Sequence, residues 1–331
     1  MKERKRNLSL ISRKHLQATY FVAPPLMDIR KAKPRSKLLA FIKRLRIAII
    51  TKGGHVCIDF SNTEKLVASG TLLFVAELRR SISLAKHKTR VSCIPPKKRL
   101  IAQVFQQVGV FRLVGYRKKI NIGQHDDVVH WCFATGHGAE GEKFDDILGN
   151  YDGRIATALS RKLYQGITEA MTNAHHHAYI SPRQDGLLVD RQVRDWWMFS
   201  QEKDDYLHVV FCDLGVGIPE TLPRKHPSIW QKLLETLVAS NVDDARVIQE
   251  ATKLEKSRTE QHHRGRGLGQ MVKAVTENFH GSIDIYSNQG RYTVSAGRQD
   301  KLRNYESSIL GTLISWTIPI SKREHIYYAQ N

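Results

Sequence analysis

One stretch constrains this chain more than any other: residues 164–179, which read YQGITEAMTNAHHHAY. Glu169, Asn173 and His177 are spaced four residues apart, so in a helix they line up along one edge. A carboxylate and an amide beside a buried stripe cost free energy unless something satisfies them. They are either ordinary polar residues of a helix surface or part of a binding site. The apolar residues that predict the buried face recur at helical spacing: Leu159, Leu163, Ile167, Ala170, Met171, Ala174 and Ala178.

Two later glycine-rich stretches bear on that choice. Residues 207–219 read LHVVFCDLGVGIP, an apolar strand that ends in Asp213 and a turn. Residues 264–271 read RGRGLGQM and open a helix. Each stretch alone also fits an ordinary turn or a flexible loop. Together with the helix they form an ordered set over about a hundred residues, which is more specific than any single motif.

The set resembles the three-box pattern of the GHKL ATPases, the group of gyrase, Hsp90, histidine kinases and MutL. The boxes are E-A-x-x-N-A from Glu169, D-x-G-x-G-I from Asp213 and G-x-G-L-G from Gly265. The helix is most similar to that of anti-sigma-factor serine kinases. The resemblance implies a two-layer α/β sandwich (the Bergerat fold) over residues 156–325, with ATP and magnesium as cofactors.

The resemblance also implies a role for each residue of the boxes. Asp213 accepts a hydrogen bond from the adenine amino group, and Thr312 lies near the adenine. Asn173 is a ligand of a magnesium ion that is held mainly by phosphates. Glu169 is the general base, toward water or a serine or threonine hydroxyl. The glycine boxes let the base and the phosphates approach the backbone, through Gly215, Gly217, Gly265, Gly267, Leu268 and Gly269.

The function expected from this resemblance has two forms. The first is a signalling enzyme, a magnesium-dependent ATPase or a protein serine/threonine kinase. The second is a non-catalytic regulator that uses ATP to gate binding of a protein or nucleic acid. Residues 220–264 correspond to the lid, and at this length we expect them to hold helices and to move on nucleotide binding. A zinc site at the histidine run 175–177 is a weaker alternative, because consecutive helix residues point in different directions.

The N-terminal third differs from the rest in charge. Residues 1–120 hold 28 Lys and Arg against 5 Asp and Glu, whereas the remainder holds 24 against 27. Such a bias fits contact with nucleic acid or an acidic partner, and it equally fits a solvated basic surface. A protein partner or self-association is therefore expected, and nucleic-acid binding through residues 1–120 stays open.

Residues 37–120 alternate short strands with helices and predict a small α/β unit. A strand that ends in Asp59, the turn Ala68-Ser69-Gly70 that opens a helix, and the later GVFRLVG resemble a STAS domain. In that family the turn usually reads D-S-S-G, and its second serine is the phosphorylation site. That position is Ser69 here, but Val67 and Ala68 replace the usual Asp-Ser before it, so a helix N-cap is the favoured role. Ser36 is expected to cap the preceding helix, and residues 1–36 to form a basic, flexible or partly ordered lead-in.

The expected organisation is thus a basic segment (1–36), a STAS-like unit (37–120), a bridge that holds the first strand of the ATPase unit (121–155) and the ATPase unit (156–325). No apolar run reaches membrane-spanning length. The cysteines are scattered singly within apolar runs and favour a reduced, cytoplasmic protein; they are Cys57, Cys93, Cys132 and Cys212.

Overall fold

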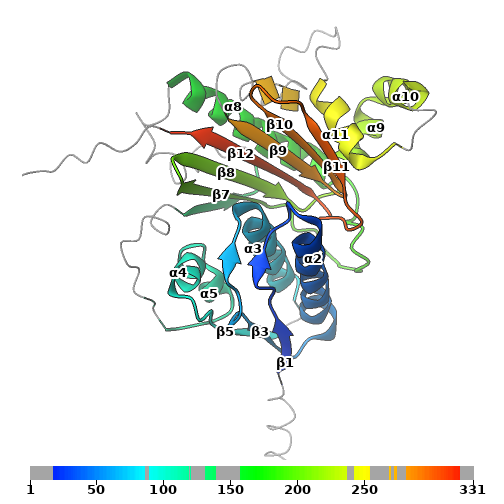
Figure 1. Ribbon diagram of the computed structural model, residues 1–331. Helices are drawn as coiled ribbons and strands as arrows, with labels where there is room; N and C mark the ends of the chain where they lie inside the picture. Colours follow the sequence, from blue (N-terminus) through cyan, green and yellow to red (C-terminus); the bar gives the residue numbers. More distant parts are fainter. Residues whose placement is uncertain are drawn as a thin grey trace, which may run out of the picture.

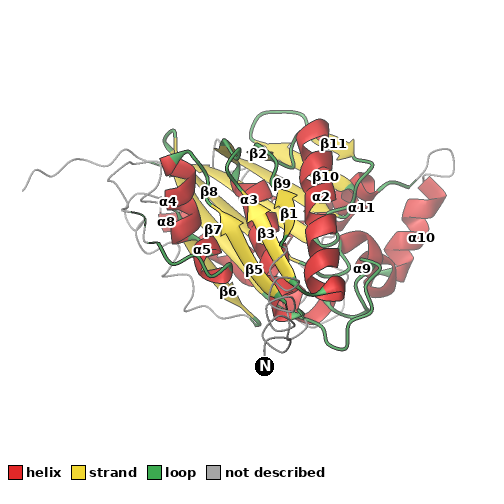
Figure 2. Ribbon diagram, turned by 90° about the horizontal axis from the view of Figure 1, so that it is seen from below, coloured by secondary structure: helices red, strands yellow, loops and turns green. Residues whose placement is uncertain are grey.

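The computed structural model describes residues 18–85, 89–118, 120, 131–138, 157–236, 242–253, 268–269, 272–273 and 281–320. The architecture is mixed α/β, with two main sheets and helices packed on them (Figure 1). Helices α2 and α3 lie between the small sheet and the large sheet (Figures 1 and 2). Helices α8, α9, α10 and α11 lie on the other side of the large sheet, whereas α4 and α5 lie on the side of the small sheet.

The large sheet is seven-stranded and antiparallel throughout, in the order β11-β10-β9-β12-β8-β7-β6. Its strands are β6 (Cys132–Gly136), β7 (Trp196–Lys203), β8 (Tyr206–Asp213), β9 (Ser282–Ser287), β10 (Gly290–Ser295), β11 (Lys301–Asn304) and β12 (Thr312–Pro319).

Strand β7 shows why this sheet needs a cover on both faces. Residues 196–199 read WWMF and are all buried. Trp197 and Phe199 pack into the core with α3, whereas Trp196 and Met198 pack into the core with the central helix. Successive side chains of a strand point to opposite faces, so a continuous apolar run is stable only between two layers.

The small sheet is parallel, in the order β1-β3-β5. Its helix α3 is buried on nearly every side, as expected of a helix held between two layers. A two-stranded sheet of β2 and β4 completes this part. The elements are β1 (Thr19–Val22), β2 (Leu26–Met27), α2 (Ala32–Ile47) with the π-helical turn η1 (Ala48–Lys52), β3 (His55–Asp59), β4 (Lys65–Leu66), α3 (Ala68–Ser83), β5 (Arg90–Ile94), α4 (Arg99–Gln107) and α5 (Val110–Leu113).

The central helix α8 (Thr157–Asn173) continues into a π-helical turn, η4 (Ala174–Ala178). Its predicted apolar face is confirmed from Leu163 onward, because the remaining members of the stripe are buried in one cluster. The side chain of Leu159 lies outside the described residues. The expected lid holds α9 (Ile218–Lys225), α10 (Pro227–Thr236) and α11 (Asp244–Lys253), so helices are confirmed in its described part.

Two local expectations were wrong. In the described part of the expected lead-in, β1 pairs with β3 and α2 begins at Ala32. Ser36 therefore lies inside α2, whose N-cap is Lys31. Ser69 does not cap α3 either: the N-cap is Val67, and Ser69 sits in the first turn with 4% of its surface exposed.

One hydrophobic core joins the N-terminal part to the large sheet. The cluster around α3 includes Phe74 of the helix, Ile58 of β3 and Val210 of β8. The N-terminal part therefore shares its core with the large sheet, while the boundaries expected at residues 36, 120 and 155 stay predictions. All four cysteines are free thiols. No helix in the described ranges has the length and apolar character needed to cross a bilayer.

Candidate functional site

Three neighbouring strands end in polar side chains at the same level of the large sheet. Thr312 of β12 pairs with Asp213 of β8 on one side and with Ser287 of β9 on the other. The hydroxyls of Ser287 and Thr312 lie 3.3 Å apart. Adjacent strands in register bring these side chains side by side, so Asp213, Thr312 and Ser287 form one polar row at the end of the sheet.

Asp213 supplies the carboxyl group of this row, and its environment shifts its pKa. Its side chain is 5% exposed, and burial raises its pKa to about 6. The backbone N–H groups of Gly215 and Thr312 favour the charged form and offset part of that effect; the Gly215 bond is 3.0 Å long. A carboxylate has about four acceptor positions, so Asp213 can still accept hydrogen bonds from a ligand.

The turn after Asp213 is seated on the end of the central helix. A Cβ atom on Gly215 would lie 2.1 Å from the carbonyl oxygen of Ala178, so only glycine fits there. The N–H of Val216 donates to that same oxygen at 2.7 Å. Gly217 has a φ of +86° and would bring a Cβ to 2.8 Å from Ser287 Oγ. The glycines of this box thus hold β8, β9 and the helix end together.

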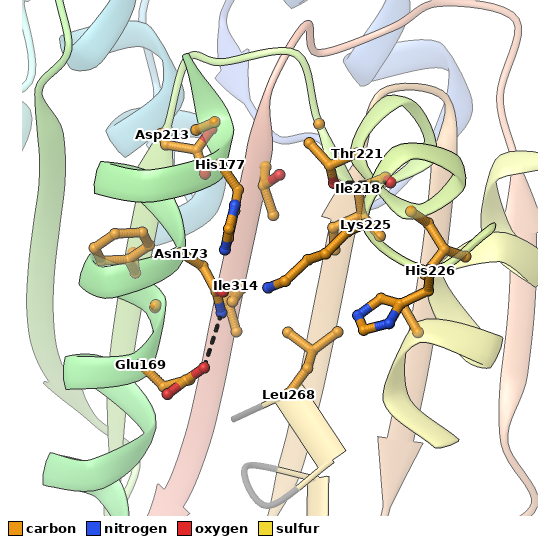
Figure 3. A pocket seen from close by; sticks show the side chains of 17 residues that line it. Glu169, Asn173, His177, Asp213, Ile218, Thr221, Lys225, His226, Leu268 and Ile314 are labelled. Atoms are coloured by element: carbon orange, nitrogen blue, oxygen red, sulfur yellow. Dashed lines mark hydrogen bonds between the residues drawn. The ribbon is translucent and has the colours of Figure 1, made fainter. Parts of the chain in front are cut away.

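Helix α8 supplies the second wall of the pocket. Glu169, Asn173 and His177 all line it, and Figure 3 shows them one above another along the helix. Asn173 Nδ2 donates to Glu169 Oε1 at 3.5 Å, which leaves Asn173 Oδ1 as its acceptor atom. The helix changes to π geometry directly after Asn173, and such turns occur often at functional sites.

Helix α9 supplies the opposite wall, and its residues were not predicted. Lys225 lines the pocket and reaches across it toward Asn173 (Figure 3). Burial lowers the pKa of Lys225, and the charge of Glu169 acts in the opposite direction. His226 follows it at the rim, and burial lowers its pKa as well. The pocket therefore holds a cation facing a carboxylate and an amide.

The apolar part of the pocket lies between these polar walls. It is formed by side chains from the sheet, the lid helices and the third glycine box: Phe211, Ile218, Leu222, Ala251, Leu268 and Ile314. A flat apolar space with a few convergent polar groups is typical of a small-molecule site.

Of the expected site residues, six meet in this one pocket: Glu169, Asn173, Asp213, Gly217, Leu268 and Thr312. Gly215 lies behind them, under Asp213. A Cβ on Gly269 would meet the Thr252 carbonyl oxygen at 2.7 Å, so this glycine allows close packing on α11. Gly265 and Gly267 lie outside the described residues.

The histidine run diverges as expected of consecutive residues. His175 and His176 are exposed, and His175 Nδ1 lies 3.0 Å from the carbonyl oxygen of His137. His177 turns into the pocket (Figure 3). Within the described ranges, no group of three His, Cys, Asp or Glu side chains is arranged to hold a metal ion.

Two positions at the pocket and the polar row escaped sequence reasoning for different reasons. Ser287 ends a strand, and only the register of three strands brings it beside Thr312. Lys225 sits in a stretch that reads IPETLPRK and carries no motif. The one available signal was its place seven residues after Ile218, since residues at this spacing share a helix face.

Comparison with protein-family models and with curated proteins gives no match to this chain.

Proposed function

We propose that this protein binds ATP with magnesium in the pocket between α8 and the large sheet, as a GHKL-type ATPase or protein kinase. One observation carries the proposal: residues of three separated boxes, from Glu169 to Leu268, line a single pocket. The boxes alone do not require this, because they lie on a helix, a strand end and a lid segment. A common pocket is what a shared ligand needs.

Asp213 would hold the adenine through its remaining acceptor positions. It is buried and fixed by two backbone N–H groups, so it can accept from an amino group without rearranging. Phe211 and Ile314 would pack against the plane of the base. Thr312 lies beside Asp213 and lines the pocket, so it would supply its hydroxyl to the base edge, with the buried Ser287 next to it.

The phosphates and the magnesium ion of ATP would lie near Asn173, Glu169 and Lys225. Asn173 Oδ1 suits magnesium, which keeps most of its waters and takes few protein ligands. Lys225 would balance phosphate charge from the opposite wall. Glu169 lies one helical turn from Asn173 and would orient and deprotonate the attacking hydroxyl group. Bound ATP and magnesium would supply the phosphoryl group and its charge neutralisation.

Ser69 is a poor acceptor for a kinase reaction of this kind. It is 4% exposed and lies in the first turn of α3. The adjacent Gly70 packs on the backbone of Met27, since a Cβ there would meet its oxygen at 2.5 Å. A phosphate on Ser69 would require this contact to open, so we expect any transfer to reach another acceptor.

The test is calorimetric titration of the full chain with ATP, with and without magnesium. Asp213→Asn should weaken ATP binding in both conditions. Asn173→Ala should remove the part of the affinity that depends on magnesium. Asp204→Asn, the same change in an exposed turn, should bind like wild type. Unchanged ATP affinity in both pocket variants would refute the site.

The reaction is tested separately, by incubation with γ-labelled ATP and magnesium. Free labelled phosphate indicates an ATPase, and labelled protein indicates a kinase. Binding without either product indicates the regulator that gates a partner.

A further inference from the structure

The outer edge of the small sheet is open within the described part of the chain. β5 pairs with β3 along one edge and is the last strand in the order β1-β3-β5. No other described strand pairs with it. Such an edge presents a row of backbone N–H and C=O groups that can pair with another extended chain.

A groove follows this open edge. It is formed by the end of α3, the first half of β5, and residues 112–118, which comprise the end of α5 and the segment after it. Figure 2 shows the small sheet from its outer side, with β5 at the edge. Ile82, Val91 and Leu113 line the groove and pack on the main core. The groove therefore has an apolar floor that is fixed in position.

The walls of the groove carry only positive charge. Four exposed cations line it, and no carboxylate does; they are Arg90, Arg112, Arg117 and Lys118. None of the four takes part in an ion pair with another described residue. Elsewhere in the described N-terminal part, Arg30, Arg46 and Arg80 have carboxylate partners, whereas the exposed Lys33 and Lys37 of α2, like the groove cations, form no ion pair with a described residue. The groove thus concentrates charge that the protein itself leaves unbalanced.

We propose that this groove binds an acidic, extended peptide segment of a partner protein, which adds a strand to the open edge of β5. The backbone edge would supply the hydrogen bonds and the cations would select carboxylates. Side chains of an added strand alternate between two faces. The segment that fits therefore alternates apolar residues, toward Ile82 and Leu113, with acidic residues, toward the arginines.

A peptide fits this groove better than a nucleic acid does. Phosphates would be attracted by the cations, but they make no use of a strand edge. Binding of single strands also relies on aromatic side chains that are presented to the bases. Tyr116, the aromatic residue of the groove, instead packs on Phe111 with ring centroids 4.7 Å apart.

The test is fluorescence anisotropy with the full chain and a labelled peptide of about eight residues, the length of a typical strand, with alternating Glu and Val. Three probes act as comparisons: the same peptide with Lys in place of Glu, the Glu-Val peptide N-methylated at alternate residues, and a single-stranded DNA of equal charge. We expect binding of the unmodified acidic peptide alone. N-methylation removes the backbone donors that a strand needs, so it should abolish binding although the charge is unchanged.

The matched variants reverse the same amount of charge in two places. Arg112→Glu with Arg117→Glu should weaken peptide binding by about tenfold or more. Lys33→Glu with Lys37→Glu, on the exposed face of α2, should stay within about twofold of wild type. All four positions are exposed, so each double variant should unfold at the wild-type temperature.

The proposal is overturned by any of three results. The first is no binding of the acidic peptide at low salt. The second is equal binding of the N-methylated peptide or of DNA, which would make the groove a general polyanion site. The third is an equal loss in the α2 variant, which would assign the effect to net charge. None of these results bears on ATP binding.

Discussion

Two groups of charged side chains lie on opposite faces of the large sheet, and their environments differ. On the α3 face, Glu77 is held by Arg46 at 3.0 Å and by Arg183 at 2.5 Å. Asp185 is held by Arg80 at 2.9 Å. On the α8 face, no ion pair within the described residues includes Glu169, Asp213 or Lys225. The charged side chains on the α3 face therefore form ion pairs with one another and make a closed group. Those on the α8 face line a pocket and make an open group.

The pKa values of two fully buried carboxyl groups show what this difference means. Burial raises the pKa of both groups. At Glu77, Arg183 and Arg46 outweigh burial and hold the pKa at about 2. At Asp213, two backbone N–H groups and Arg183 do not outweigh it, and the pKa stays near 6. A carboxyl group with a perturbed pKa that lines a pocket is a candidate functional group.

Arg183 connects the two groups. It donates to Glu77 and also to the carbonyl oxygen of Leu310 at 2.7 Å. Leu310 lies two residues before Thr312 of the pocket. Arg183 of the α3-face group therefore also holds the residues just before β12, whose first residue, Thr312, lines the pocket.

The largest expected effect is on turnover and comes from Glu169. Glu169→Gln retains size and hydrogen bonding to Asn173, so ATP binding should persist. Loss of the base should reduce turnover by about two to four orders of magnitude. Phosphate release and calorimetry on one preparation give the two quantities. The same change at Glu64, an exposed residue, is the control. Equal turnover in wild type and Glu169→Gln, once contaminating ATPases are excluded, would show that Glu169 is not the base.

The second effect is on the free energy of unfolding. Removing a carboxylate should lower it at Glu77 but not at Asp213. Glu77→Gln leaves three buried arginines with Asp185 alone and should cost about 3–5 kcal/mol of unfolding free energy. Asp213→Asn removes a carboxylate that burial already disfavours, so unfolding free energy at pH 7 should stay equal or rise. Urea denaturation of the two variants measures both. A large loss in Asp213→Asn would mean that this carboxylate is as well compensated as Glu77.

The third effect is the pH dependence of binding. Asp213 accepts hydrogen bonds best when ionised, so affinity for ATP should rise by about tenfold between pH 5 and pH 7 as the group titrates through about 6. Its effect on stability runs the other way. The folded pKa lies above the unfolded value of 3.8, so the stabilisation is complete below 3.8 and is lost as the pH rises through about 6. The phosphates of ATP also titrate in this range, so the pH dependence of ATP affinity in Asp213→Asn serves as the reference. If ATP affinity changes with pH equally in wild type and Asp213→Asn, Asp213 is not the titrating group.

The sequence predicted best the features that depend on short-range pattern. The stripe of α8 from Leu163, the strands around Trp196 and Val210, and the helix from Arg99 to Gln107 follow from periodicity. The strands β10 and β11 were not predicted, because RYTVSAGRQDKLRN is mostly polar, although β10 pairs with its neighbours in sequence, β9 and β11. The packing of α3 on the large sheet has no local signal at all, since it depends on a surface more than a hundred residues away.

The pocket residues divide in the same way: short-range pattern predicted some of them, and long-range packing brought in the others. Glu169 and Asn173 could be placed together because they share a helix face, and Asp213 because it ends an apolar strand. Lys225 could not, since the direction of α9 brings it into the pocket, and neither could Ser287, since cross-strand register brings it beside Thr312 of the pocket. The buried ion group on the other face was missed for the same reason: Glu77 and Arg183 are 106 positions apart.

The smallest expected effect separates the two ends of the pocket and concerns Lys225. Its side chain crosses the pocket toward Asn173 and Glu169 (Figure 3), so it should interact with phosphates and not with the base. It is partly exposed to solvent, which screens the interaction. Lys225→Met keeps most of the side-chain length and should weaken ATP binding by about fivefold, while binding of adenosine stays unchanged. Arg224→Met, at the neighbouring position outside the pocket, should bind both ligands like wild type.

An equal loss of affinity for ATP and adenosine in Lys225→Met would mean that Lys225 supports the shape of the pocket and does not contact the phosphates. A loss for ATP alone would place the phosphates between α8 and α9, on the side of the pocket away from Asp213.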